Sequence, residues 1–310
     1  MKRPFAFTIA VLAVLDLSCS HRNLVGVEFV SQWGSKGSGA GEFSEPIGVA
    51  LDRDGNLYVA DAGNSRIQKF TPDGKFLIEW GKKGRGEGEL DRPIHLEVSS
   101  DDLVYVPEYG NDRIQVFDTN GEFQFSWGTT GKTLGQFDAP GSVGFDRTGN
   151  ALVTDFYNHR VQRFDEKGNF LSEFGMKGHD AGQLHYPTDI LVDQHGNSLV
   201  ADAYNHRIQK FDEQNNLIVS WGHQGKKEGE FEVANALALD EGDRVYVVDF
   251  DNHRVQVFDE AAKFLLSFGG QGAGAGQFNH PTDIAVSKDG LIYMADWGNN
   301  RIQVFHTVER

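Results

Sequence analysis

Apolar and polar residues alternate along most of the chain, in short segments that are separated by turn residues. Four such segments are clearest in one early stretch, at residues 47–52, 57–60, 66–70 and 76–80. Alternation with a period of two over four to eight residues is the pattern of a β-strand with one buried face. The residues between the segments are rich in Asp, Asn and Gly, which favour tight turns. The stretch therefore predicts an antiparallel sheet of four strands.

The same pattern returns every 47 residues, with no insertion or deletion. Asn64 and Arg66 mark the register, and the corresponding pairs are Asn111/Arg113, Asn158/Arg160, Asn205/Arg207, Asn252/Arg254 and Asn299/Arg301. A four-stranded sheet of this size cannot cover both of its apolar faces alone, and radial stacking of such sheets buries them. Six copies therefore predict an all-β fold, a six-bladed β-propeller of four-stranded antiparallel blades.

The two ends of the repeat array complement each other. Residues 27–34 alternate like a strand, and Phe29 and Trp33 keep the register of the fourth strand of each copy. The last copy ends at its third strand, Ile302 to Phe305, with five residues remaining. We therefore expect the N-terminal strand to complete the last blade, which removes two open sheet edges. On this interpretation residues 27–310 form one closed propeller.

The first residues have the pattern of an export signal. Two basic residues precede a short apolar segment, which has too few residues to cross a bilayer that needs about 20. We predict a signal peptide over residues 1–18 and a linker over 19–26. Cys19 lies where this segment would be cut, which resembles the lipobox of bacterial lipoproteins, although Asp16 stands where that pattern has an aliphatic residue. Two alternatives follow: a periplasmic or cell-envelope lipoprotein anchored to the membrane through Cys19, or a secreted protein.

Charge and composition exclude some partners. The formal net charge of −16 argues against nucleic acid, because binding to phosphates depends on Lys and Arg. Cys19 is the single cysteine, so an intramolecular disulfide and a multi-cysteine zinc site are excluded. No combination of nucleophile, base and orienting residue is recognisable. The interpretation therefore favours a monomeric, non-enzymatic protein without a cofactor.

The repeat resembles the NHL repeat. The resemblance rests on Gly55 to Asp61, followed by Asn64 and by Arg66 to Phe70, and it is closest in three copies: Asn158-His159-Arg160, Asn205-His206-Arg207 and Asn252-His253-Arg254. It covers residues 27–305 and implies a six-bladed propeller of the bacterial exported type. It implies no single function, because the family spans RNA-binding and ubiquitin-ligase-associated modules, an amidating lyase and many exported bacterial proteins.

Some positions depart from the family pattern. The second copy has Pro107-Glu108 in place of Ala-Asp, and the fifth has Ala234 in place of the repeat proline, so we expect local adjustment of those blades. The amidating lyase of the family carries zinc-binding histidines directly after the repeat proline on alternate blades. Here those positions hold no histidine: Ile47, Ile94, Gly141, Thr188, Asn235 and Thr282. The resemblance therefore does not imply that enzyme.

Repetition separates structural residues from candidate site residues. An acidic residue and an arginine, as in Asp61 and Arg66, recur in all six copies. We interpret them as scaffold, in which carboxylate and guanidinium pair bidentately and hold the turn. The histidines His159, His206 and His253 lie on neighbouring blades, so we interpret them as structural turn residues rather than as a shared metal site.

The position two residues after the repeat proline differs most between copies. It holds Gly48, His95, Ser142, Asp189, Ala236 and Asp283, at the start of the innermost strand. We predict that His95, Asp189 and Asp283 meet at the mouth of the central tunnel, where they could hold a cation or a small polar ligand. The alternative is a polar channel that holds only water. A cation there would favour a metal-dependent lyase or lactonase-like hydrolase.

Aromatic residues form the second candidate site. Five of the six turns between the second and third strands carry them, at Tyr109, Phe156, Tyr157, Tyr204, Phe250 and Trp297. Exposed aromatic side chains are common anchors of binding surfaces. We therefore predict an exported scaffold that binds a protein, peptide or glycan on this loop face. The alternative is that the rings only pack over neighbouring loops.

Overall fold

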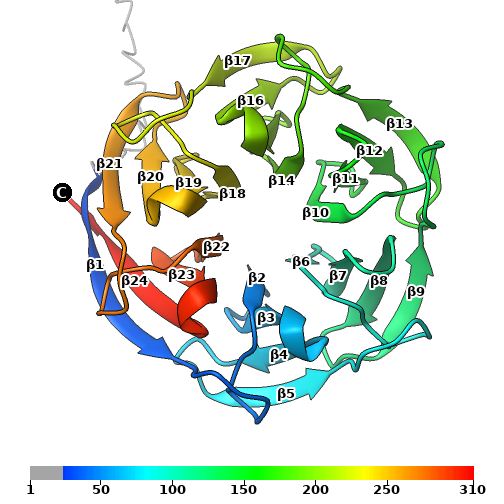
Figure 1. The fold of residues 1–310 in the computed structure, drawn as a ribbon, viewed down its shortest axis with the longest axis horizontal. Coiled ribbons are helices and arrows are strands. Elements are labelled where there is room, and N and C mark those ends of the chain that lie inside the picture. The colour runs from blue at the N-terminus through cyan, green and yellow to red at the C-terminus, as the bar shows by residue number, and fades with distance from the viewer. Residues whose placement is uncertain (1–23) are drawn as a thin grey trace, which may run out of the picture.

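A computed structural model describes residues 24–310. The predicted signal peptide at residues 1–18 and the lipidation candidate Cys19 lie outside the described residues. Within residues 24–310, no helix is long and apolar enough to cross a bilayer. The fold is an all-β propeller of six four-stranded antiparallel sheets around a central axis, as predicted (Figure 1).

The strands of each blade run from the axis to the rim in chain order, except that the rim strand of blade 6 is β1. Blades 1 and 2 comprise β2 (Pro46–Leu51), β3 (Leu57–Asp61), β4 (Arg66–Phe70), β5 (Phe76–Trp80), β6 (Glu97–Val98), β7 (Leu103–Glu108), β8 (Arg113–Asp118) and β9 (Phe123–Trp127). Blades 3 and 4 comprise β10 (Pro140–Phe145), β11 (Ala151–Asp155), β12 (Arg160–Phe164), β13 (Phe170–Phe174), β14 (Pro187–Val192), β15 (Ser198–Asp202), β16 (Arg207–Phe211) and β17 (Leu217–Trp221). Blades 5 and 6 comprise β18 (Ala234–Leu239), β19 (Val245–Asp249), β20 (Arg254–Phe258), β21 (Phe264–Gly269), β22 (Pro281–Val286), β23 (Leu291–Asp296), β24 (Arg301–Glu309) and β1 (Leu24–Trp33).

Short 3-10 turns connect the second and third strands of four blades: η1 (Ala62–Asn64), η2 (Ala203–Asn205), η3 (Phe250–Asn252) and η4 (Trp297–Asn299). Blade 2 is adjusted, as its sequence predicts, because its innermost strand β6 is only two residues long. Blade 5 is not shortened, since β18 keeps six residues although alanine replaces the proline. The repeat proline is therefore not required for the innermost strand.

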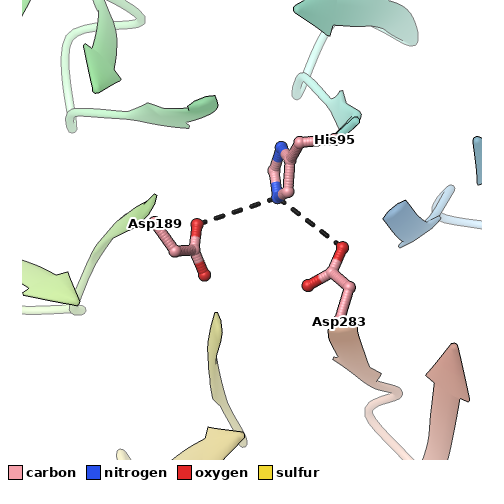
Figure 2. Close-up of side chains that lie close together, drawn as sticks. All are labelled: His95, Asp189 and Asp283. Atoms are coloured by element: carbon pink, nitrogen blue, oxygen red, sulfur yellow. Dashed lines mark ion pairs between the residues drawn. The ribbon is translucent and has the colours of Figure 1, made fainter. Parts of the chain in front are cut away.

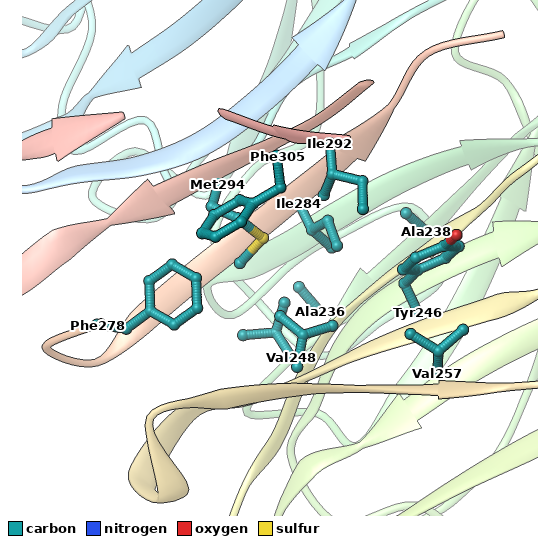
Figure 3. Close-up of a cluster of buried hydrophobic side chains, with 11 residues drawn as sticks. Ala236, Ala238, Tyr246, Val248, Val257, Phe278, Ile284, Ile292, Met294 and Phe305 are labelled. Carbon is teal, nitrogen blue, oxygen red and sulfur yellow. The ribbon is translucent and has the colours of Figure 1, made fainter. Parts of the chain in front are cut away.

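Apolar side chains fill the space between neighbouring blades, in six clusters. Figure 3 shows the cluster between blades 5 and 6, which includes Tyr246 and Val248 of β19, Met294 of β23 and Phe305 of β24. All four residues are buried. Complete burial of a side chain of this size contributes about 1.5–3 kcal/mol. Packing of blade on blade is thus the main stabilising interaction of the fold.

The N-terminal strand closes the ring, as predicted. β1 pairs antiparallel with β24, with Phe29 opposite Phe305 and Trp33 opposite Ile302. The pairing continues beyond the expected start, because Leu24 lies opposite Glu309. In Figure 1 the N-terminal strand in blue lies along the C-terminal strand in red. The first and last segments of the described chain therefore share one blade.

The recurring acidic residue and arginine form a clamp in every blade. Arg66 Nε donates to Asp61 Oδ2 at 2.7 Å, and its other N–H groups donate to three main-chain oxygens of the preceding loop, those of Ser38, Gly39 and Glu42. The predicted bidentate pairing is therefore wrong. The other carboxylate oxygen of Asp61 is occupied, since it accepts the main-chain N–H of Ser44 at 2.7 Å. The clamp thus joins the turn to the long loop, which places both on the same face of the propeller.

Candidate functional site

Three blades bring His95, Asp189 and Asp283 together on the axis of the propeller (Figure 2). His95 Nε2 lies 3.8 Å from Asp189 Oδ1 and 3.8 Å from Asp283 Oδ2. The three side chains are only 12%, 6% and 4% exposed, respectively. Asp189 and Asp283 lie near the starts of β14 and β22, and His95 lies just before β6. We call these three residues the tunnel site.

The tunnel site exists because large and small residues alternate around the axis. Blades 2, 4 and 6 carry its three side chains, and blades 1, 3 and 5 carry the small residues Gly48, Ser142 and Ala236 at the equivalent position. A Cβ atom on Gly48 would lie 2.7 Å from the Cα atom of His95, so glycine is required for the close approach of the two blades. The small residues leave room at the axis for three long side chains.

Hydrogen bonds to main-chain amides fix both carboxylates of the tunnel site. Asp189 Oδ2 accepts the N–H of Leu237 in blade 5 at 2.7 Å, and Asp283 Oδ2 accepts the N–H of Val49 in blade 1 at 2.8 Å. The Oδ1 atom of each aspartate accepts the N–H of the residue that follows it. Each carboxylate thus joins two blades and also has a fixed orientation toward the axis.

A cavity of about 320 Å³ lies along the axis at the tunnel site and is lined by the innermost strands of all six blades. Its lining includes Glu97, which the sequence reasoning missed. The equivalent positions of the other copies carry no charge: Ala50, Gly144, Leu191, Ala238 and Ala285. Glu97 is thus the one charged residue at its repeat position, and this difference between the copies is the sequence signal that marks it.

Burial controls the protonation of the groups around this cavity. Together with the nearby charge of Asp189, it raises the pKa of Glu97 to about 8. It also raises the pKa of Asp283 well above its usual value, again with a contribution from Asp189. Burial lowers the pKa of His95, an effect that the charge of Asp189 opposes. No lysine or arginine of residues 24–310 lines the cavity.

The predicted aromatic residues form two groups on the loop face. The larger group spans blades 2 to 4 and consists of Tyr109, Phe156, Tyr157, Tyr186 and Tyr204, which we call the aromatic band. The hydroxyl groups of Tyr109 and Tyr157 lie 2.7 Å apart. Tyr186 connects the others, since its ring centre lies 4.9 Å from that of Phe156 and 5.1 Å from that of Tyr204. Tyr157 and Tyr204 are 44% and 51% exposed.

The sequence reasoning missed Tyr186. It lies directly before the repeat proline, where the other copies have Glu45, Arg92, Ala139, Val233 and His280. The smaller aromatic group lies in blades 5 and 6, where the rings of Phe250 and Trp297 pack on His280 with centroid distances of 4.9 Å and 6.1 Å. The rings thus pack on one another, and two of them are also exposed.

Two of the turn histidines support these rings. His159 Nδ1 accepts the main-chain N–H of Tyr186 at 3.1 Å, and His253 Nδ1 accepts that of His280 at 3.0 Å. Both histidines have positive φ angles, which suits a turn position. Their role in this structure is structural, in agreement with the sequence interpretation.

Five segments of the chain match the family model for the NHL repeat, at residues 43–70, 137–164, 184–211, 231–258 and 278–305. The chain therefore carries NHL repeats, on a six-bladed propeller. The second copy, which has Pro107-Glu108 at the family's Ala-Asp position, is not among the matched segments.

Curated relatives match over short stretches only. The E3 ubiquitin-protein ligase TRIM71 of Rattus norvegicus is 45% identical over 58 residues, which is 18% of this chain and 7% of that protein. Protein lin-41 of Caenorhabditis elegans is 44% identical over 45 residues, which is 14% of this chain and 4% of that protein. The chain thus spans less than a tenth of the length of these relatives.

Solved structures match over the whole propeller. A protein of unknown function from Bacteroides thetaiotaomicron has a TM-score of 0.70 and 18% identity, over 91% of this chain and 76% of that chain. Virginiamycin B lyase from Staphylococcus aureus has a TM-score of 0.63 and 14% identity, over 91% of this chain and 100% of that chain. At such identities the similarity shows the shared fold alone.

Proposed function

We propose that the protein is a binding scaffold that recognises an extended segment of a partner protein on the loop face of its propeller. The observation that supports this most directly is the aromatic band, in which Tyr157 and Tyr204 remain about half exposed beside packed rings. Tyrosine offers a large contact area and a hydroxyl group while it loses little conformational entropy on binding.

The aromatic band is held on rigid loops. The arginine clamp of each blade ties its long loop to the neighbouring turn, and His159 fixes the main chain at Tyr186. Rings that already pack on one another lose little further freedom when a ligand binds, which leaves more of the contact energy for affinity. The net charge of −16 favours a partner segment that carries lysine or arginine.

The test uses the exposed rings. In the double variant Tyr157→Ala/Tyr204→Ala we expect binding to the partner to weaken about tenfold or more, because exposed anchors of this type carry most of the affinity of an interface. The matched control is Leu171→Ala/Ile218→Ala, which removes two side chains of similar exposure from the outer strands β13 and β17. Thermal unfolding should show that both double variants remain folded.

Binding is measured first on peptide and glycan arrays and then by calorimetry with the best ligand. Saturable binding to peptides that is lost in the tyrosine variant and kept in the control supports the proposal. Binding only to glycans would show that the ligand of the aromatic band is a sugar and not a peptide. Equal peptide binding by the tyrosine variant and the wild type would refute the role of the band.

The same proposal places the protein outside the cytoplasm, either anchored to the cell envelope through a lipid on Cys19 or secreted. Its support is the pattern of residues 1–18 followed by that cysteine. Mass spectrometry of the mature N-terminus distinguishes an acylated Cys19 from a simple cut. We expect Cys19→Ser to release an anchored protein from membranes, and an unprocessed N-terminus would contradict export by this route.

A metal-dependent lyase or lactonase-like hydrolase at the tunnel mouth is the second candidate function. The observation that favours it is the convergence of His95 with two carboxylates next to a cavity. Such chemistry depends on a cation at this place, since a bound metal would polarise a substrate carbonyl or activate water.

A further inference from the structure

The donor atoms of the tunnel site are spaced for a metal ion. Its imidazole and two carboxylates each offer one donor atom, all within 4.8 Å of one another, and two of the separations are 3.8 Å. A triangle of this size has its centre about 2.2–2.5 Å from each corner. Zinc lies about 2.0–2.2 Å from nitrogen and oxygen ligands, and calcium about 2.3–2.6 Å from oxygen ligands. A small contraction of the side chains thus suffices for coordination.

The imidazole of His95 lacks partners within the described part of the chain. Its Nδ1 atom is buried and has no hydrogen bond. Its Nε2 atom lies between the two carboxylate oxygens at 3.8 Å, which is too long for a hydrogen bond. Buried polar nitrogens are normally satisfied, and an unsatisfied one in a native protein calls for an explanation. A cation bound between the two carboxylates would give Nε2 a partner, while Nδ1 keeps its buried position without one.

The charge of the tunnel site also favours a cation. Asp189 and Glu97 line a cavity that no lysine or arginine of residues 24–310 lines, and Asp283 lies beside it, 3.8 Å from His95 Nε2. Buried carboxylates are normally paired with a positive group or coordinate a metal. The amide hydrogen bonds described above stabilise the orientation of both aspartates, as supporting hydrogen bonds do around metal ligands.

We propose that His95, Asp189 and Asp283 bind one divalent transition-metal cation, zinc or manganese, on the axis of the propeller. One imidazole nitrogen with two carboxylate oxygens is a mixed donor set that suits these ions better than calcium or magnesium, which prefer oxygen alone. The ligands come from alternate blades and approach the axis from three sides (Figure 2). The adjoining cavity leaves coordination positions open to water or to a small ligand.

A second cluster of possible metal ligands serves as a comparison for the tunnel site. His195 Nε2 lies 3.6 Å from Asp243 Oδ2 and 3.4 Å from Glu260 Oε1, at the turns on the opposite face of the propeller. The side chains of His195 and Glu260 are 54% and 57% exposed, so this cluster lies on the surface and its side chains are less constrained. Any test of the tunnel site must separate the two clusters.

The experiment is calorimetric titration of the chelator-stripped mature protein with zinc chloride and with manganese chloride. The variant His95→Ala removes one ligand and introduces a side chain that Ala236 already shows to fit at the equivalent position. His195→Ala is the matched control. We expect the wild type and His195→Ala to bind zinc or manganese at the tunnel site, and His95→Ala to lose about 100-fold or more in affinity for that site.

Cobalt serves as a second probe. The wild type and His195→Ala, loaded with cobalt, should show the same visible absorption bands, and the bands should change in His95→Ala. This comparison remains valid if His95→Ala proves unstable. In that case the His195→Ala protein alone shows whether the surface cluster is needed for cobalt binding. Absence of saturable zinc and manganese binding, or loss of binding in His195→Ala instead, would overturn the proposal. Either result leaves the proposal for the aromatic band unaffected.

Discussion

Acidification should destabilise the propeller through His159. This residue is 6% exposed, and its Nδ1 atom accepts the main-chain N–H of Tyr186 at 3.1 Å. A protonated imidazole has no acceptor nitrogen, so this hydrogen bond requires the neutral form. Burial, followed by the positive charges of Lys177 and His185, lowers the pKa of His159 to about 4. The folded protein therefore binds this proton much more weakly than the unfolded chain does.

The magnitude follows from the difference in pKa between the two states. In the unfolded chain a histidine has a pKa of about 6.5. Above that pH both states are neutral at this residue and stability is unaffected by it. As the pH falls below about 6.5, only the unfolded state gains the proton, so the free energy of unfolding decreases until both states are protonated near pH 4. At pH 5 the loss is about 2 kcal/mol, at roughly 1.4 kcal/mol per unit of pKa difference.

The matched variant is His159→Asn. Asn300 occupies the equivalent position of the sixth copy, with a φ angle of 52° against 57° for His159, and its Oδ1 atom accepts the N–H of Glu45 at 3.2 Å. Asparagine thus keeps the acceptor but does not titrate. We expect urea unfolding to show that the free energy of unfolding decreases between pH 7.5 and pH 5.0, and that this decrease is about 2 kcal/mol larger in the wild type than in the variant. Equal losses in the two proteins would refute the reasoning.

Two further predictions concern the scaffold. Deletion of residues 27–34 should abolish the cooperative thermal transition followed by circular dichroism, because it removes most of the strand that pairs with β24; an unchanged transition would contradict closure by β1. The variant Arg66→Ala should lower the free energy of unfolding by about 3–5 kcal/mol in urea titrations, since it leaves the fully buried carboxylate of Asp61 without its cation. A loss below about 1 kcal/mol would show that the clamp is not structural.

The number and closure of the blades could be predicted because both follow from the spacing of the repeats along the chain. A fixed period of 47 residues and a final copy that lacks its fourth strand lead directly to six blades and to closure by the N-terminal strand. The pairing geometry of arginine and carboxylate in the clamp could not be predicted in the same way. Whether Arg66 meets one or both oxygens of Asp61 depends on where the loop carbonyls lie, which is a property of three-dimensional packing.

Repetition also explains which residues of the candidate sites could be recognised from the sequence. His95, Asp189 and Asp283 share one repeat position, so symmetry alone brings them to the axis. Glu97 and Tyr186 lie at other positions and were missed. The innermost strands have a register irregularity after the proline, as between Pro46 and Val49, and alternation along the strand then no longer shows which side chains face the tunnel.

The differences between the copies follow from the symmetry of the fold. Six equivalent side chains at one level of a narrow tunnel would collide, so long residues there can be accommodated on only some of the blades. This chain places them on three alternate blades and puts glycine, serine and alanine between them. Three long side chains on alternate blades approach the axis from three sides, which is also how ligands surround a metal ion. The steric requirement of the propeller and the donor arrangement of a cation site are therefore met by the same residues, and metal titration of His95→Ala separates the two roles, because alanine satisfies the first and not the second.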